Sequence, residues 1–222
     1  VTGSALKDVL NLGAVGSTYN GGYGNDDLTG TIAQLLTGTT YNIINGGNGT
    51  DTLNIANGSA NVTLVDNTFK NITNVEKLVV TSTGTGTQSI VTGGFFNTNF
   101  AAGVTLVGTT VGTSSGVTTY DLASYSGPAT IGLTTAATTA DTTVTTGAGK
   151  DIVAINAAAV TTGDVTLSTG AGNDTLGITV TSKLESGAVI TFNGGAGKDL
   201  ITASGVDAAD VIYVGFDIGA GD

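Results

Sequence analysis

Short stretches in which apolar and polar residues alternate, separated by glycine-rich turns, run through most of the chain. Segments such as VTLVGTTVGT (104–113) and ATIGLTTAAT (129–138) follow the two-residue period of a β-strand. One segment, 27–36, has a helix-like pattern, in which Thr29 or Thr31 could cap a short helix containing Leu35 and Leu36. The pattern therefore predicts an all-β fold of many short strands.

Five nine-residue segments repeat one motif of glycines, a fixed aspartate and a following apolar residue. Segments 21–29 (GGYGNDDLT), 46–54 (GGNGTDTLN) and 194–202 (GGAGKDLIT) read Gly-Gly-x-Gly-x-Asp-x-apolar-x. Segments 146–154 (TGAGKDIVA) and 169–177 (TGAGNDTLG) replace only the first glycine, by threonine. One copy would favour an ordinary glycine turn of a β-sandwich, whereas five copies with the aspartate at a fixed place favour a calcium-binding repeat.

The residue types of the motif suit a calcium site between stacked turns. Glycines allow positive φ angles and let backbone carbonyls approach an ion, and each aspartate offers a hard anionic oxygen. Strands of neighbouring coils lie about 4.8 Å apart, so calcium with oxygens at about 2.3–2.6 Å fits between equivalent turns. The candidate Ca²⁺ residues are Gly21, Gly22, Gly24, Asp26, Gly46, Gly47, Gly49, Asp51, Gly147, Gly149, Asp151, Gly170, Gly172, Asp174, Gly194, Gly195, Gly197 and Asp199.

These motifs resemble the repeats-in-toxin (RTX) family, whose nonapeptides bind calcium in a parallel β-roll and occur in bacterial toxins, proteases, adhesins and surface-layer proteins. The resemblance implies several calcium ions bound by the motif turns. Unlike the tandem family arrangement, the motif here recurs about once in two dozen residues, which leaves the remaining ligands of each ion open.

Spacing of the aspartates predicts the length of a coil. Asp26 and Asp51 are 25 residues apart, and 100 residues, or four such periods, separate Asp51 from Asp151. One period after Asp51 lies Glu76, within NVEKLVV (74–80), a segment that resembles those following calcium motifs in surface-layer proteins. We expect Val75 and Leu78 to fill the core, and Glu76 to cap a turn rather than to bind calcium.

The chain reads as one elongated parallel β-roll or β-helix solenoid, 1–222, forming part of a longer protein. Motif blocks occupy 1–55 and 146–222, and the second ends in an incomplete motif, residues 219–222. Between them, 56–145 is rich in Thr and Gly and fits either further coils or a small β insert. Weaker candidate acids are Asp8, in a degenerate opening copy of the motif, and Asp121 and Asp141 in the central segment.

Composition narrows the class of function. The 222 residues carry six Lys, no Arg, no His, no Cys and a net charge of −11, which disfavours nucleic-acid and anionic-membrane partners. No run approaches the roughly 20 apolar residues of a membrane span, so no membrane insertion is expected. Without Arg, His or Cys the usual bases and nucleophiles are missing, and we expect no enzymatic activity.

The expected function is structural: a component of an extracellular bacterial surface layer that folds and assembles with calcium after export. By resemblance, such proteins use type I secretion, self-associate into a lattice, and are anchored to the cell surface through other parts of the chain. The alternative is the RTX-type adhesin, or an ice- or carbohydrate-binding solenoid. Rows of Thr-x-Thr would favour that alternative, but from the sequence they cannot be placed at a constant position in the coil.

Overall fold

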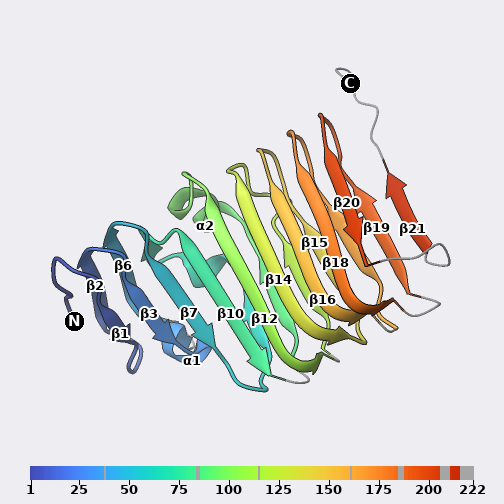
Figure 1. The fold of residues 1–222 in the computed structure, drawn as a ribbon. Helices are drawn as coiled ribbons and strands as arrows, with labels where there is room; N and C mark the ends of the chain where they lie inside the picture. Colours follow the sequence, from blue (N-terminus) through green and yellow to red (C-terminus); the bar gives the residue numbers. More distant parts are fainter. Residues whose placement is uncertain are drawn as a thin grey trace.

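Parallel strands stack into a β-solenoid of about 25 residues per turn in the computed structural model, as the sequence predicted (Figure 1). The structure describes residues 1–37, 39–83, 86–114, 116–160, 162–184, 188–205 and 211–215. The incomplete motif at 219–222 lies outside these residues. No helix in the described part of the chain is both long and apolar enough to cross a membrane.

Two parallel sheets form the long walls of the solenoid. The nine-stranded sheet contains, in stack order, β1 (Val9–Asn11), β3 (Asp27–Gly30), β7 (Thr52–Ala56), β10 (Lys77–Thr83), β12 (Val104–Ser114), β14 (Ala129–Thr138), β16 (Ile152–Val160), β18 (Thr175–Leu184) and β20 (Leu200–Ser204). The seven-stranded sheet contains β8 (Val62–Leu64), β11 (Gln88–Val91), β13 (Thr118–Asp121), β15 (Thr142–Thr145), β17 (Val165–Ser168), β19 (Val189–Asn193) and β21 (Val211–Gly215).

Smaller elements complete the coils at the N-terminal end and in the centre. A third parallel sheet contains β2 (Thr18–Tyr23), β6 (Ile43–Asn48) and β9 (Ile72–Thr73), and β4 (Leu36–Thr37) pairs antiparallel with β5 (Thr40–Tyr41). The helices are α1 (Ile32–Leu35), the 3₁₀ helix η1 (Asp66–Phe69) and α2 (Gly94–Asn99). Apart from β9, the strands within 56–145 lie in the same two large sheets as the flanking strands, so the stack continues through this segment.

The helix expected over 27–36 was partly wrong. Residues 27–30 form strand β3, because they pair in register with β7. The helix is limited to α1, which Thr31 caps: the Thr31 backbone N–H donates to Gln34 Oε1 (2.8 Å), and the Gln34 N–H donates to the Thr31 carbonyl oxygen (3.0 Å). Pairing with the neighbouring coil therefore decided the first half of this segment, and local capping decided the second.

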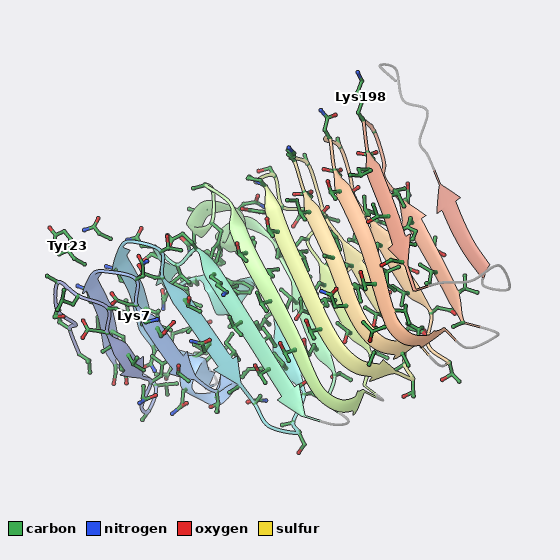
Figure 2. All side chains as sticks on the ribbon, in the orientation of Figure 1. Lys7, Tyr23 and Lys198 are labelled. Atoms are coloured by element: carbon green, nitrogen blue, oxygen red, sulfur yellow. The ribbon has the colours of Figure 1, made fainter. Side chains whose placement is uncertain are left out.

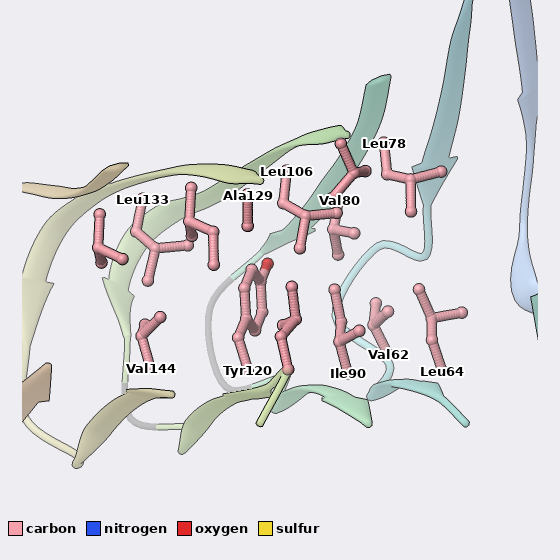
Figure 3. Packing of buried hydrophobic residues seen from close by; sticks show 14 of the residues in the cluster. Val62, Leu64, Leu78, Val80, Ile90, Leu106, Tyr120, Ala129, Leu133 and Val144 are labelled. Atoms are coloured by element: carbon pink, nitrogen blue, oxygen red, sulfur yellow. The ribbon is translucent and has the colours of Figure 1, made fainter. Parts of the chain in front are cut away.

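Apolar side chains from the two large sheets meet in one continuous core. The residue two places after each motif aspartate points inward, as Leu28, Leu53 and Leu176 show with exposures of 0%. Figure 3 shows Leu78, Val80, Leu106 and Leu133 of one sheet facing Val62, Leu64, Ile90, Tyr120 and Val144 of the other. Val75 and Leu78 are buried as predicted. Each coil thus buries an apolar row that it could not bury alone.

Candidate calcium sites in the motif turns

The motif aspartates lie one above another at the point where each coil enters the nine-stranded sheet. Strand pairing aligns Asp27 with Thr52 and Ile152 with Thr175, which places the preceding aspartates of neighbouring coils side by side. The same register brings Asp8 beside Asp26 and Glu76 beside Asp51. We call Asp8, Asp26, Asp51 and Glu76 the first acidic column and Asp151, Asp174 and Asp199 the second.

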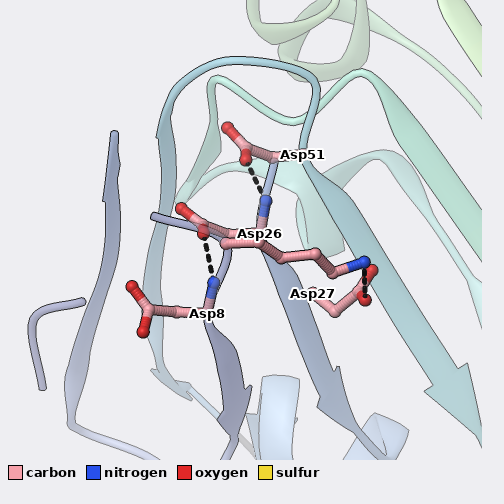
Figure 4. A network of polar contacts seen from close by, with 5 residues as sticks. Asp8, Asp26, Asp27 and Asp51 are labelled. Carbon is pink, nitrogen blue, oxygen red and sulfur yellow. Dashed lines mark hydrogen bonds and ion pairs between the residues drawn. The ribbon is translucent and has the colours of Figure 1, made fainter. Parts of the chain in front are cut away.

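Each column is held by hydrogen bonds from the backbone N–H groups of one coil to the carboxylates of the next. In the first column the N–H groups of Asp8, Asp26 and Asp51 donate to the next coil's carboxylate at 2.8, 2.7 and 2.8 Å. Figure 4 shows the first two of these bonds. In the second column the N–H groups of Ala129, Asp151 and Asp174 donate to Oδ1 of Asp151, Asp174 and Asp199 at 2.7, 2.8 and 2.9 Å.

The second oxygen of the motif carboxylates has no protein partner. Asp26, Asp51, Asp151 and Asp174 are at most 1% exposed, and the Oδ2 atom of each is buried without a hydrogen bond. The described residues contain one ion pair, between Lys7 Nζ and Asp27 Oδ2 (2.7 Å). It lies outside the column and does not neutralise the buried carboxylates (Figure 4). A buried, uncompensated carboxylate oxygen is energetically costly. These four oxygens are therefore suited to bind a cation.

Glycines make the turns narrow enough for the carboxylates to lie against backbone. A Cβ at the first motif position, Gly21, Gly46 or Gly194, would lie within 2.7 Å of Oδ2 of the same motif's aspartate. At the fourth position Gly24 and Gly49 have φ of +120° and +140°, and their backbones stack directly on neighbouring turns. The variable positions point outward, as Tyr23 and Lys198 show (Figure 2). Fixed motif residues thus form the inner wall of each turn.

Threonine at the first motif position adds a hydroxyl beside the carboxylates, a feature the sequence reasoning missed. Thr169 Oγ1 donates to the Gly194 carbonyl oxygen (2.7 Å), while Thr146 Oγ1 is buried without a partner. The signal was visible in the two TGAGxD motifs, but a substitution of glycine does not by itself show which way a side chain points. The hydroxyls add two oxygen atoms to the inner wall of the C-terminal turns.

Burial and like charge both act on the carboxylates of the columns. Desolvation by burial raises the pKa of Asp51, helped by the neighbouring charges of Asp26 and Glu76 and opposed by the N–H bond from the Asp26 backbone. The pKa of Asp174 is raised by burial in the same way; the charges of Asp151 and Asp199 add to this rise, and the hydrogen bond from the Asp151 backbone opposes it. A divalent cation between neighbouring turns would offset both unfavourable effects.

The two columns are separated by coils that carry apolar residues at the same position. Register places Val104 beside Glu76 and beside Ala129, which in turn precedes the second column. A surface depression of about 300 Å³ lies at this break, lined in part by Glu76, Val104 and Pro128. Glu76 accepts the Asp51 N–H bond and is half-buried, in agreement with its predicted place as a turn cap. The expected four coils between Asp51 and Asp151 are all present.

No family model, curated protein or solved structure matches this chain. The function must therefore be argued from the geometry of the site.

The remaining candidate acids lie outside the buried turns or have their own partners. Asp8 continues the first column, but its Oδ2 accepts bonds from the Ser4 backbone and hydroxyl. Asp121 Oδ1 accepts the Ala123 N–H (3.1 Å), and Asp141 Oδ1 accepts the Asp164 N–H (3.0 Å) at the opposite end of the strands. Neither of these two belongs to a column.

The donor set of the turns suits calcium better than a transition metal. Within the described ranges no three Asp, Glu, His or Cys side chains converge on one point. An ion between neighbouring turns would take carboxylate oxygens from the two aspartates and complete its shell with backbone carbonyls of the glycine turns. Calcium accepts six to eight such oxygens in flexible geometry, whereas zinc and copper prefer nitrogen and sulfur ligands.

Proposed function

We propose that this chain is a calcium-stabilised structural segment of a secreted bacterial surface protein, and that it forms part of an extracellular layer. The observation that carries the proposal is the set of four buried aspartates whose Oδ2 atoms have no partner. In a calcium-free chain these charges oppose the stacking of the coils. Calcium converts the same carboxylates into bridges between coils, so metal binding and folding become one event.

Calcium is scarce in the cytosol and abundant outside the cell, so a chain that folds only with calcium would fold after export. Extracellular calcium modules bind with Kd values of about 10⁻⁴ to 10⁻³ M. At the low calcium level of the cytosol the acidic chain would remain unfolded and suitable for export, and it would fold outside the cell. The net charge of −11 and the RTX-like motifs support this sequence of events. Assembly into a lattice and anchoring through other parts of the chain belong to the same proposal.

The test is a titration of metal-free protein with calcium, followed by far-UV circular dichroism and isothermal calorimetry. We expect a cooperative gain of β-structure with several bound ions, and no comparable gain with magnesium, whose rigid octahedral shell does not suit carbonyl-rich turns. Magnesium also controls for simple charge screening. Metal-free protein that is already fully folded and binds no calcium would disprove the calcium proposal.

Lattice assembly is a separate step and needs its own measurement. Folded protein in calcium should form ordered sheets or filaments visible by electron microscopy. Folded protein that stays monomeric at high concentration would contradict self-assembly by this segment without affecting the calcium sites.

A further inference from the structure

We propose that the outer face of the seven-stranded sheet binds an ordered lattice of water, that is, the surface of ice. This inference does not depend on the calcium proposal, because it concerns the face of the sheet that points away from the core. It rests on a row of hydroxyl side chains that the sequence did not allow us to align.

One outward position of the coil carries a hydroxyl in six successive strands. The register of the sheet joins these residues one to the next without a bulge. We call them the threonine row: Thr63, Ser89, Thr119, Thr143, Thr166 and Thr191. They alternate with buried residues of the same strands, so the row faces away from the core that Figure 3 shows.

A second row lies two residues further along the same strands. It begins with Val91 and continues through Asp121, Thr145, Ser168 and Asn193, again in direct register. Thr143 with Thr145 and Thr166 with Ser168 therefore form two hydroxyl pairs of the Thr-x-Thr type on neighbouring coils. Strand spacing sets about 4.8 Å along each row, and the rise of two residues sets about 6.6 Å between the rows.

The hydroxyls of the threonine row are free to bind solvent. None of the six makes a hydrogen bond with another residue in the described ranges, in contrast to Thr169 or Ser124, whose hydroxyls donate to backbone carbonyls. Most of the row is half-buried between neighbouring strands, and the branched Cβ restricts χ1 of threonine. The hydroxyls and methyl groups thus repeat with nearly fixed orientation, and little side-chain entropy remains to be lost on binding.

The surface of ice is the ligand that such a face fits best. An ice surface is neutral, flat and periodic in two directions, with oxygen atoms that repeat every few ångströms. A protein partner would favour exposed aromatic or Arg anchors, and the threonine row has neither. Among the described residues, the charges beside the threonine row are Asp121, which lies in the second row, and Asp141 and Asp164, which accept backbone N–H bonds at the turn.

The opposite face of the solenoid carries a less regular hydroxyl row: register aligns Thr81, Thr109, Thr134, Asn156, Thr179 and Ser204. Asn156 interrupts this row, and the Ser204 hydroxyl donates to Thr179 Oγ1 (3.1 Å). A second outward row of this sheet, which runs from Val9 to Leu200, mixes hydroxyls with other side chains: Asp27, Thr52, Lys77, Thr105, Thr130, Ile152 and Thr175 lie between its ends. The pairings of β12 with β14 and of β16 with β18 also contain register shifts. This face therefore provides a matched control surface on the same molecule.

The test measures thermal hysteresis and partition into growing ice for the whole chain, folded in calcium. We expect hysteresis for the natural sequence and loss of most of it in Thr166→Lys and in Thr143→Lys, because a long charged side chain disrupts the row. Thr134→Lys, on the exposed face of the other sheet, should retain full hysteresis. Circular dichroism and the melting temperature check that each variant is folded.

Three outcomes would overturn the inference. Folded protein that shows no hysteresis and is excluded from ice does so directly. Equal hysteresis in Thr166→Lys and the natural sequence would move ice binding to another surface. A dimer that sedimentation velocity detects, and that Thr166→Lys dissociates while no hysteresis is present, would assign the face to a second copy. If the calcium-free protein stays folded, it should still bind ice, which separates this test from the calcium titration.

Discussion

Strands β3, β7, β16 and β18 each follow a buried aspartate, whereas β12 and β14 begin with Val104 and Ala129 at the equivalent place. The motif coils fill this position with a carboxylate, one oxygen of which has no hydrogen-bond partner in Asp26, Asp51, Asp151 and Asp174. The central coils fill it with apolar atoms, and η1 and α2, which stack on one another, lie ahead of this position in their coils. The same strand register thus accepts two kinds of turn, one with a buried carboxylate and one with apolar side chains.

The central coils have their own source of stability. Phe96 lies at the middle of an aromatic cluster, with ring centroids 4.8 Å from Phe69, 4.5 Å from Phe100 and 5.1 Å from Tyr125. Nearby, the buried Tyr120 hydroxyl donates to Gln88 Oε1 (2.7 Å) and Gln88 Nε2 donates to Ser82 Oγ (2.8 Å). Under the calcium proposal, the solenoid would be divided into calcium-dependent ends and a calcium-independent centre without interruption of its sheets.

Removal of calcium should have the largest effect and should act unevenly along the chain. Each site occupied at a hundred times its Kd contributes about 2.7 kcal/mol, and several sites are lost together. We expect hydrogen exchange, read by mass spectrometry in a chelator, to accelerate first in the coils around Asp26 to Asp51 and Asp151 to Asp199. The central strands β11 and β13 should remain protected longer. Uniform acceleration would contradict the division into two kinds of coil.

Phe96→Ala should have the next largest effect, and calcium should not change it. Phe96 is fully buried, so its truncation should lower the free energy of unfolding by about 3–5 kcal/mol. Phe95→Ala is the control, because Phe95 is 41% exposed and its loss should cost no more than about 0.5 kcal/mol. Chemical denaturation at two calcium concentrations measures both. A Phe96→Ala cost that disappears in chelator would place the aromatic cluster within the calcium-dependent unit.

The effect of Asp174→Asn on the free energy of unfolding should have opposite signs with and without calcium. Asparagine keeps the oxygen that accepts the Asp151 N–H but removes the buried charge. We expect it to destabilise the calcium-bound protein and to stabilise the calcium-free protein, each by about 0.5–3 kcal/mol, a range typical of single substitutions.

Asp141→Asn is the matched control for that substitution, because its exposed carboxylate also accepts a backbone N–H. It should change little in either condition. Melting curves with and without calcium, together with the number of bound ions, measure the difference. A destabilisation of equal size in both conditions would show that Asp174 acts only through its hydrogen bond.

The pH dependence of stability should be the smallest effect, and its direction should also be opposite with and without calcium. The pKa values of Asp51 and Asp174 are raised in the folded, metal-free chain, so the folded state binds more protons than the unfolded state. Calcium-free protein should therefore gain stability as the pH falls from neutral toward about 4, the ordinary carboxyl pKa, and gain nothing more below it. With calcium, protons compete with the ion and stability should fall. Melting temperatures across this pH range, measured in both conditions, check the two signs.

Much of the fold could be read from local signals. The glycine motifs predicted the turns, the 25-residue spacing of Asp26 and Asp51 predicted the length of the coil, and the 100 residues from Asp51 to Asp151 predicted four coil periods. Strand β3 was partly missed, because residues 27–30 carry a weak local preference that pairing with β7 overrides. The aromatic cluster was also missed, since Phe69, Phe96, Phe100 and Tyr125 show no regular spacing.

The sequence by itself determined the turn chemistry and the inward rows, because both depend on residues close together along the chain. The solenoid register decided what spans the coils: the unpaired Oδ2 atoms, the break at Val104 and Ala129, and the threonine row. Coil lengths vary between neighbouring turns, so Ser89 and Thr119 are 30 residues apart while Thr143 and Thr166 are only 23 apart. A constant outward position is consequently hidden in the sequence and appears only when backbone hydrogen bonds align the strands.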